Sequence, residues 1–174
     1  GELSVTGTGF GDTLNASLFT GNGANGLTLN GGSGADNIVG TDFDDIITGG
    51  NGTDVITAGD GSDNITGGSG SDTFVFNSVS GEDTIVDYTV ADDSIQISKA
   101  IFTGLGDIGA LSSDEFVSGA GLTDAADETD RIVYDTTSGN LYYDADGSGG
   151  VAAVQIATLT GTPDLLSSEF AIIA

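Results

Sequence analysis

The sequence contains no histidine, cysteine, methionine or tryptophan, a single proline, and only two basic residues. Without histidine or cysteine there is no Ser–His or Cys–His nucleophile pair, no disulfide and no conventional zinc site. The lack of cysteine leaves the redox compartment open, because a secreted protein can be held together by metal instead. No apolar run approaches the length of a membrane span, so we expect no direct insertion into a membrane.

The charge is strongly one-sided. Acidic residues number 27 and basic residues 2, which gives a formal net charge of −25. Phosphate backbones and anionic headgroups repel such a chain, so we expect no nucleic-acid partner. High charge with few aromatics is typical of disorder, yet 37% of the residues are apolar. A folded state therefore needs either a solvated acidic surface or a bound hard cation, and the placement of the acids decides between them.

The first residues, Gly1-Glu2-Leu3, include no initiator methionine, basic segment or apolar segment. The sequence therefore predicts no N-terminal signal peptide and indicates a piece of a longer protein.

Glycine is abundant, at 30 positions, and regularly spaced. From Gly31 the sequence falls into five nine-residue units: GGSGADNIV, GTDFDDIIT, GGNGTDVIT, AGDGSDNIT and GGSGSDTFV. The sixth place of every unit is aspartate: Asp36, Asp45, Asp54, Asp63 and Asp72. The eighth place is always large and apolar: Ile38, Ile47, Ile56, Ile65 and Phe74. The second and fourth places are glycine except in the second unit, which has Thr41 and Phe43.

Each place in the unit has a physical reason. Glycine supplies the unusual dihedrals that a closed turn with several inward carbonyls needs. A short strand follows, whose middle apolar residue points inward. No single unit can bury that residue alone, so the units must stack. The available ligands are carboxylate and carbonyl oxygens, which favours Ca²⁺ over transition metals and over the stricter octahedral Mg²⁺.

The units resemble the glycine-rich nonapeptide GGxGxDxUx of the repeats-in-toxin (RTX) family of secreted bacterial proteins. The resemblance implies an all-β fold, namely a right-handed parallel β-roll of these repeats followed by a β-rich C-terminal cap. In that family two successive units make one coil, and calcium lies between units n and n+2 on the same side.

Carried over to this sequence, the family pattern implies three pairs of calcium ligands: Asp36 with Asp54, Asp45 with Asp63, and Asp54 with Asp72. The implied carbonyl ligands are glycines of the turns: Gly32, Gly34, Gly50, Gly52, Gly59 and Gly61, with Gly49 and Gly67 from the following turns. Thr41 and Phe43 depart from the pattern, so the Asp45 site matches the family least well. The segment from Gly81 to Tyr88 resembles the stretch that closes RTX rolls, which implies Asp83, and secondarily Asp87, as further ligands. An alternating amphipathic strand is the compatible alternative there.

We expect three regions along the chain. Residues 1–30 are degenerate capping coils, in which GTGFGDTLN from Gly7 mirrors the second unit. Residues 31–97 are the calcium-binding roll, and residues 98–174 are the cap, with a hairpin turn at residues 137–140. Residues 164–174 resemble the C-terminal type I secretion signal of RTX proteins, and a closing edge strand of the cap is the alternative.

Three further features leave alternatives open. Residues 144–149, DADGSG, resemble the opening of an EF-hand loop without its twelfth-position glutamate, so Asp144 and Asp146 are either a polar turn or calcium ligands. The acidic cluster of residues 124–130 is either a solvated loop or a metal site. The ninth-place threonines, Thr48, Thr57 and Thr66, are either a row of side chains that binds ice or another surface, or ordinary strand residues.

The sequence as a whole predicts a calcium-binding module and not an enzyme. We expect it to stay unfolded in the cell, to pass through type I secretion machinery, and to fold on calcium outside, in a secreted or cell-surface bacterial protein. Two alternatives are the calcium-stiffened end of a large adhesin or surface-layer protein, and the accessory C-terminal module of a secreted protease, lipase or epimerase. The target of the parent protein stays open.

Overall fold

The computed structural model describes residues 3–20 and 26–174. Part of the predicted capping coil, residues 1–2 and 21–25, lies outside the described residues. Within the described part of the chain, neither of the two short 3₁₀ turns, η1 (Ser113–Glu115) and η2 (Ser167–Glu169), has the length and hydrophobicity needed to cross a membrane.

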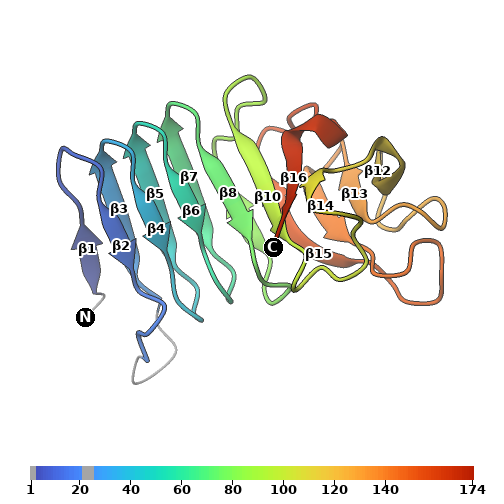
Figure 1. Ribbon diagram of the computed structural model, residues 1–174, viewed down its shortest axis with the longest axis horizontal. Helices are drawn as coiled ribbons and strands as arrows, with labels where there is room; N and C mark the ends of the chain where they lie inside the picture. The colour runs from blue at the N-terminus through green and yellow to red at the C-terminus, as the bar shows by residue number, and fades with distance from the viewer. Residues whose placement is uncertain (1–2, 21–25) are drawn as a thin grey trace.

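The described strands form two sheets that lie face to face along the molecule (Figure 1). The first sheet has the order β1 (Ser4–Thr6), β3 (Thr28–Ser33), β5 (Ile46–Asn51), β7 (Asn64–Ser69), β9 (Asp83–Ile85), β15 (Val154–Leu159), β14 (Asn140–Tyr143), β13 (Ile132–Asp135) and β12 (Phe116–Gly119). The second has the order β11 (Gly109–Ala110), β16 (Phe170–Ile173), β10 (Ser94–Ser98), β8 (Thr73–Phe76), β6 (Val55–Thr57), β4 (Asn37–Val39) and β2 (Thr13–Asn15).

Consecutive strands from β1 to β10 alternate between the two sheets, and each strand from β1 to β8 pairs in parallel with the strand one coil further on. Thr28 lies beside Ile46, and Asn37 lies beside Val55. These partners are two nine-residue units apart, so the predicted parallel β-roll with two units per coil is confirmed. The right-handed sense of the coil stays a prediction.

The eighth-place residues form the core of the roll. Ile38, Ile47, Ile56, Ile65 and Phe74 are at most 3% exposed, and each stacks on its counterpart in the next coil. Fully burying an isoleucine stabilises the fold by roughly 1.5–3 kcal/mol. The stack continues through Ile85 and Ile95 into one core that reaches Ile172 near the C-terminus.

The outward ninth-place threonines do not form a single row. Thr48 and Thr66 are neighbours in the first sheet, whereas Thr57 lies in the second sheet between Val39 and Val75. The two sheets expose opposite faces, so the three threonines that suggested an ice- or surface-binding row do not share one.

The C-terminal strands extend both sheets of the roll (Figure 1). β15 pairs in parallel with β9, and β16 pairs in parallel with β10. The predicted hairpin is confirmed, because β13 and β14 are antiparallel on either side of the turn at residues 136–139. The alternative prediction of an edge strand near the C-terminus is wrong in position, because β16 lies between β10 and the two-residue β11. Phe170 and Ile172 of β16 are buried in the core.

Candidate metal centre

The sixth-place aspartates close the turns along the two edges of the roll. Turns from the first sheet to the second carry one column of aspartates: Asp12, Asp36, Asp54, Asp72 and Asp93. Turns from the second sheet back to the first carry another: Asp45, Asp63 and Asp83. We call these the long column and the short column.

Within each column, the backbone N–H of one aspartate donates to the carboxylate Oδ1 of the aspartate one coil on. In the long column the four N–O distances are 2.6, 2.8, 2.9 and 2.9 Å. In the short column they are 2.7 and 3.1 Å, and the N–H of Leu27 donates to Asp45 Oδ1 at 2.6 Å. The structure therefore brings together all three predicted aspartate pairs, and it joins Asp83 to Asp63.

Sequence reasoning missed Asp93 as a member of the long column. The nonapeptide spacing of 18 residues between coils lengthens to 20 between Asp63 and Asp83, and to 21 between Asp72 and Asp93. A search for the unit at a fixed period therefore stops before Asp93. The available signal was Thr89 four residues earlier, the same spacing as Thr41 to Asp45.

The second carboxylate oxygen, Oδ2, is left without a hydrogen bond in four of these residues. Among the described residues, no donor reaches Oδ2 of Asp36, Asp54, Asp63 or Asp72. The four side chains are at most 2% exposed. A buried, unpartnered carboxylate oxygen is costly, because it loses its bonds to water and gains none in return. A cation at these oxygens would remove that cost.

Carbonyl oxygens from the neighbouring coil lie close to the same carboxylates. A Cβ atom at Gly31 would lie 2.5 Å from Asp36 Oδ2 and 2.6 Å from the carbonyl oxygen of Gly49. At Gly49 it would collide with Asp54 Oδ2 and with the carbonyl oxygen of Gly67, one coil further on. Gly31, Gly40 and Gly49 thus leave space where carboxylate and carbonyl oxygens of two coils converge. Such a set of hard oxygen donors suits Ca²⁺.

The predicted glycine turns have the expected backbone. The second- and fourth-place glycines all have positive φ, between 103° and 140°: Gly32, Gly34, Gly50, Gly52, Gly59, Gly61, Gly68 and Gly70. The last two, in the fifth unit, were not among the predicted ligands. Among the described residues, no three or more acidic side chains gather into one metal-holding group, so a cation here would depend on carbonyl oxygens as well as on carboxylates.

Burial makes ionisation of the carboxylates in the columns unfavourable. It raises the pKa of Asp54 and raises the pKa of Asp72 to about 6, and the charges of neighbouring aspartates push both pKa values in the same direction. Burial also raises the pKa values of Asp63 and Asp83, which lie side by side in the short column. The N–H of the preceding aspartate only partly offsets these effects. A positive ion beside the carboxylates would favour their charged form.

The carboxylate of Asp45 is different, because Oδ2 is bonded. The N–H of Thr41 donates to it at 2.8 Å and the Thr41 hydroxyl at 3.1 Å. Asp87 is also satisfied by the backbone: its two oxygens accept the N–H groups of Gly67 and Gly68, each at 2.9 Å.

Several acidic groups of the C-terminal half accept N–H groups of the turns in which they occur. Asp144 accepts the N–H of Asp146, which in turn accepts the N–H groups of Gly150 and Val151. Burial raises the pKa of Asp144. Asp130 accepts the N–H groups of residues 126 and 127. These bonds are those of polar turns, and calcium binding by Asp144, Asp146 or the 124–130 cluster stays a prediction.

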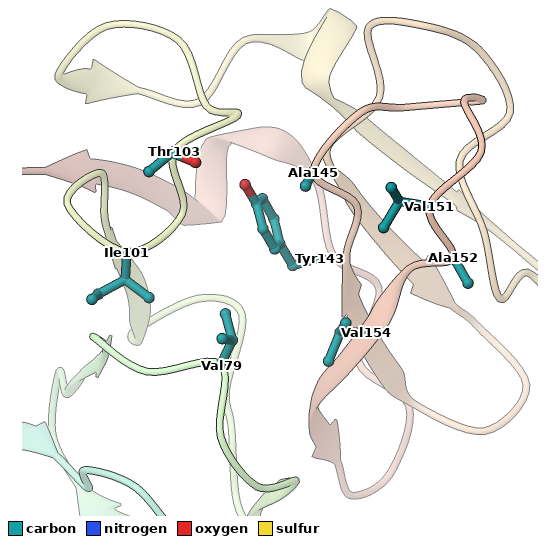
Figure 2. A pocket seen from close by; sticks show the side chains of 8 residues that line it. All are labelled: Val79, Ile101, Thr103, Tyr143, Ala145, Val151, Ala152 and Val154. Carbon is teal, nitrogen blue, oxygen red and sulfur yellow. The ribbon is translucent and has the colours of Figure 1, made fainter.

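A pocket of about 230 Å³ lies where the C-terminal strands meet the roll. Figure 2 shows Tyr143 between the apolar side chains that line it, among them Val79, Ile101 and Val154. None of its lining residues is acidic, so this pocket is separate from the aspartate columns.

Comparison with known proteins agrees with this geometry. The family model of the RTX calcium-binding nonapeptide repeat (4 copies) matches residues 30–65 and 39–74. No curated protein matches the sequence.

Two similar solved structures are subunits of the mannuronan C5-epimerase of Azotobacter vinelandii. The AlgE6R3 subunit is 21% identical, with a TM-score of 0.49 over 97% of this chain and 82% of that one. The AlgE6R2 subunit is 19% identical, with a TM-score of 0.40 over 98% of this chain and 91% of that one.

The matched segment contains the five units up to the eighth place of the last, their glycine turns and, among the described residues, the four aspartates with an unpartnered Oδ2. RTX nonapeptide repeats bind calcium, and residues 30–74 of this chain match the model of those repeats.

Proposed function

We propose that the chain is a calcium-dependent folding module of a secreted bacterial protein, which binds Ca²⁺ between its coils and acts by folding and not by catalysis. The observation that carries the proposal is the set of buried aspartates whose Oδ2 has no partner among the described residues. Such groups destabilise the metal-free fold and become favourable contacts once a cation is present.

The ligands we propose come from adjacent coils. In the long column they are Asp36, Asp54 and Asp72, with carbonyl oxygens of the first-, second- and fourth-place glycines between them. In the short column they are Asp63 and Asp83. The ion supplies positive charge, while the chain's own residues hold the oxygens in place through the backbone bonds along each column.

The size of the effect follows from mass action. Extracellular calcium modules bind with dissociation constants of roughly 10⁻⁴ to 10⁻³ M. At ten times the dissociation constant each site stabilises the fold by about 1.4 kcal/mol. Three sites together contribute about 4 kcal/mol, comparable with the low end of the stability of a whole domain. Sub-micromolar calcium in the cell would leave the chain open, and millimolar calcium outside would fold it.

Circular dichroism of the full chain tests the calcium dependence. We expect a β-sheet spectrum and a cooperative thermal transition in 5–10 mM CaCl₂, and a spectrum of a largely unfolded chain in excess EGTA. Magnesium at the same concentration is the control and should not restore the fold. An unchanged β-sheet spectrum and melting temperature in EGTA would contradict the proposal.

The secretion role is tested at residues 164–174. Deleting them removes the proposed signal but also β16, so a second variant is needed. Phe170→Ala with Ile172→Ala weakens β16 and keeps the rest of the segment. We expect the deletion to abolish export through a type I exporter while the double substitution is exported. Equal export of the deletion and the unaltered chain would show that the signal is elsewhere.

A further inference from the structure

Three aspartates of the columns have a threonine four residues before them: Thr8 before Asp12, Thr41 before Asp45, and Thr89 before Asp93. In each case the threonine N–H donates to the aspartate Oδ2, at 2.5, 2.8 and 2.8 Å respectively. The hydroxyls of Thr8 and Thr41 donate to the same oxygen at 2.9 and 3.1 Å. The carboxylates of Asp45 and Asp93 therefore have donors on both oxygens, and the carboxylate of Asp12 has two donors on Oδ2.

Glycine occupies the same place before the four aspartates with an unpartnered Oδ2. Gly32, Gly50, Gly59 and Gly68 have φ values of 103°, 117°, 113° and 106°. The threonines have a different backbone, because Thr162 is the one described residue other than glycine with positive φ. For seven of the eight column aspartates, the choice between threonine and glycine thus coincides with whether Oδ2 is bonded or left open, and Asp83 has Val79 at that place.

The threonine turns also have a common position. Asp12 and Asp93 are the two ends of the long column, and Asp45 begins the short one. Of these three, only Asp12 has a neighbouring coil on one side alone, because Leu27 of the preceding coil lies beside Asp45 and β16 lies beside β10, the strand that follows Asp93. What the three share is a threonine in the turn that leads to the aspartate. Donors from its own turn can satisfy its charge without a second coil.

We propose that the threonine acts as an internal cap that closes these three turns to calcium, so that the ion binds only at the glycine turns of Asp36, Asp54, Asp63 and Asp72. A cation at Oδ2 of Asp45 would have to displace the Thr41 N–H and hydroxyl from that oxygen, whereas at Asp54 it displaces no donor. This inference rests on the proposed calcium binding and departs from the Asp45–Asp63 site that the family pattern implies.

Calcium stoichiometry of the full chain, measured by equilibrium dialysis, tests the cap. We expect Asp45→Asn to bind as many ions as the unaltered chain, and Asp54→Asn to bind at least one fewer. Asparagine keeps the shape of the side chain and an acceptor for the backbone N–H groups. An equal loss in both variants would overturn the cap and leave calcium binding intact, whereas no binding by the unaltered chain would overturn the proposed function itself.

A gain of binding provides the complementary test. Rebuilding the family turn with Thr41→Gly and Phe43→Gly together should add one ion, and Phe43→Gly alone should add none, because Thr41 still bonds Asp45. Thr41→Ser, which keeps both donors, is the matched control and should leave the number unchanged. A folded double variant with no additional ion would contradict the cap, and if the double variant does not fold, the comparison of Asp45→Asn with Asp54→Asn decides.

Discussion

At the scale of single residues, the aspartates and glycines of the repeat do separate tasks. The aspartate Oδ1 accepts a backbone N–H from the preceding coil and so links the two coils, and Oδ2 is left for a further partner. The glycines lack a Cβ and so leave space for this arrangement, and they adopt the positive φ angles that it needs. A Cβ atom at Gly50 would collide with the carbonyl oxygen of Gly32 in the preceding coil, and Gly50 has a φ of 117°.

Gly50→Ala should therefore destabilise the calcium-loaded fold by at least about 1–2 kcal/mol, because it combines a left-handed alanine with a backbone collision. Gly9→Ala is the matched control, since a Cβ there meets no atom within 4 Å and φ is not positive. It should change stability by less than about 0.5 kcal/mol. Urea unfolding in calcium measures both, and equal effects would show that the space around Gly50 is not restricted.

The stacking of the repeat's aspartates could be predicted from sequence because each occupies a fixed place in the unit. Asp36, Asp54 and Asp72 recur every 18 residues, and the structure stacks them at that spacing. The bonding of Thr41 to Asp45 could not be predicted in the same way. It depends on the backbone conformation of the turn, which the departure from glycine signals but does not specify.

At the scale of elements, the C-terminal strands complete the roll. β16 pairs with β10 in the same register in which β10 pairs with β8, so Ile95 lies between Phe74 and Phe170. The strand thus extends the stack of inward residues by one further layer. This makes residues 170–173 part of the folded core, whatever role they have in export.

Phe170→Ala should lower the free energy of unfolding by about 3–5 kcal/mol, because Phe170 is 2% exposed in the core. Leu166→Ala, four residues earlier and 60% exposed, should change it by less than about 0.5 kcal/mol. Thermal unfolding in saturating calcium distinguishes the two. A similar small effect of both substitutions would mean that β16 does not pack on the roll in solution.

Sequence reasoning was more successful for the repeat strands than for the C-terminal strands. In β4, β6 and β8 the nonapeptide specifies both the strand and its neighbour, because contacts join residues a constant distance apart. The parallel pairing of β15 with β9 joins residues 74 positions apart, Asp83 with Ala157, with an antiparallel hairpin in between. No local period signals that contact, so the strands were expected but their partners were not.

At the scale of the whole molecule, the net charge of −25 opposes compaction. The repulsion is strongest in the two columns, where buried carboxylates lie next to one another. Without calcium, the raised pKa values mean that the folded state binds more protons than the unfolded state. Stability from these groups is then fully present below the unfolded pKa, near 4, and is lost as the pH rises through the folded pKa, about 6 for Asp72.

We therefore expect calcium-free protein to become less stable as the pH rises from 4.5 to 8. In saturating calcium the trend should reverse, because protons compete with the ion for the carboxylates. The β-sheet circular dichroism signal of the calcium-free chain and the melting temperature in calcium measure the two trends across this range. Asp72→Asn should weaken the calcium-free dependence near pH 6. A calcium-free protein whose β-sheet signal rises with pH would contradict the assignment of raised pKa values to the columns.

The most direct measurement of the central claim is a crystal structure grown in calcium, with anomalous diffraction data collected at a wavelength where calcium scatters anomalously. We expect anomalous peaks between adjacent coils, beside Oδ2 of Asp36, Asp54, Asp63 and Asp72, and none at the threonine-capped Asp12, Asp45 and Asp93. Density for water alone beside the first four carboxylates, in a crystal soaked in millimolar calcium, would contradict it.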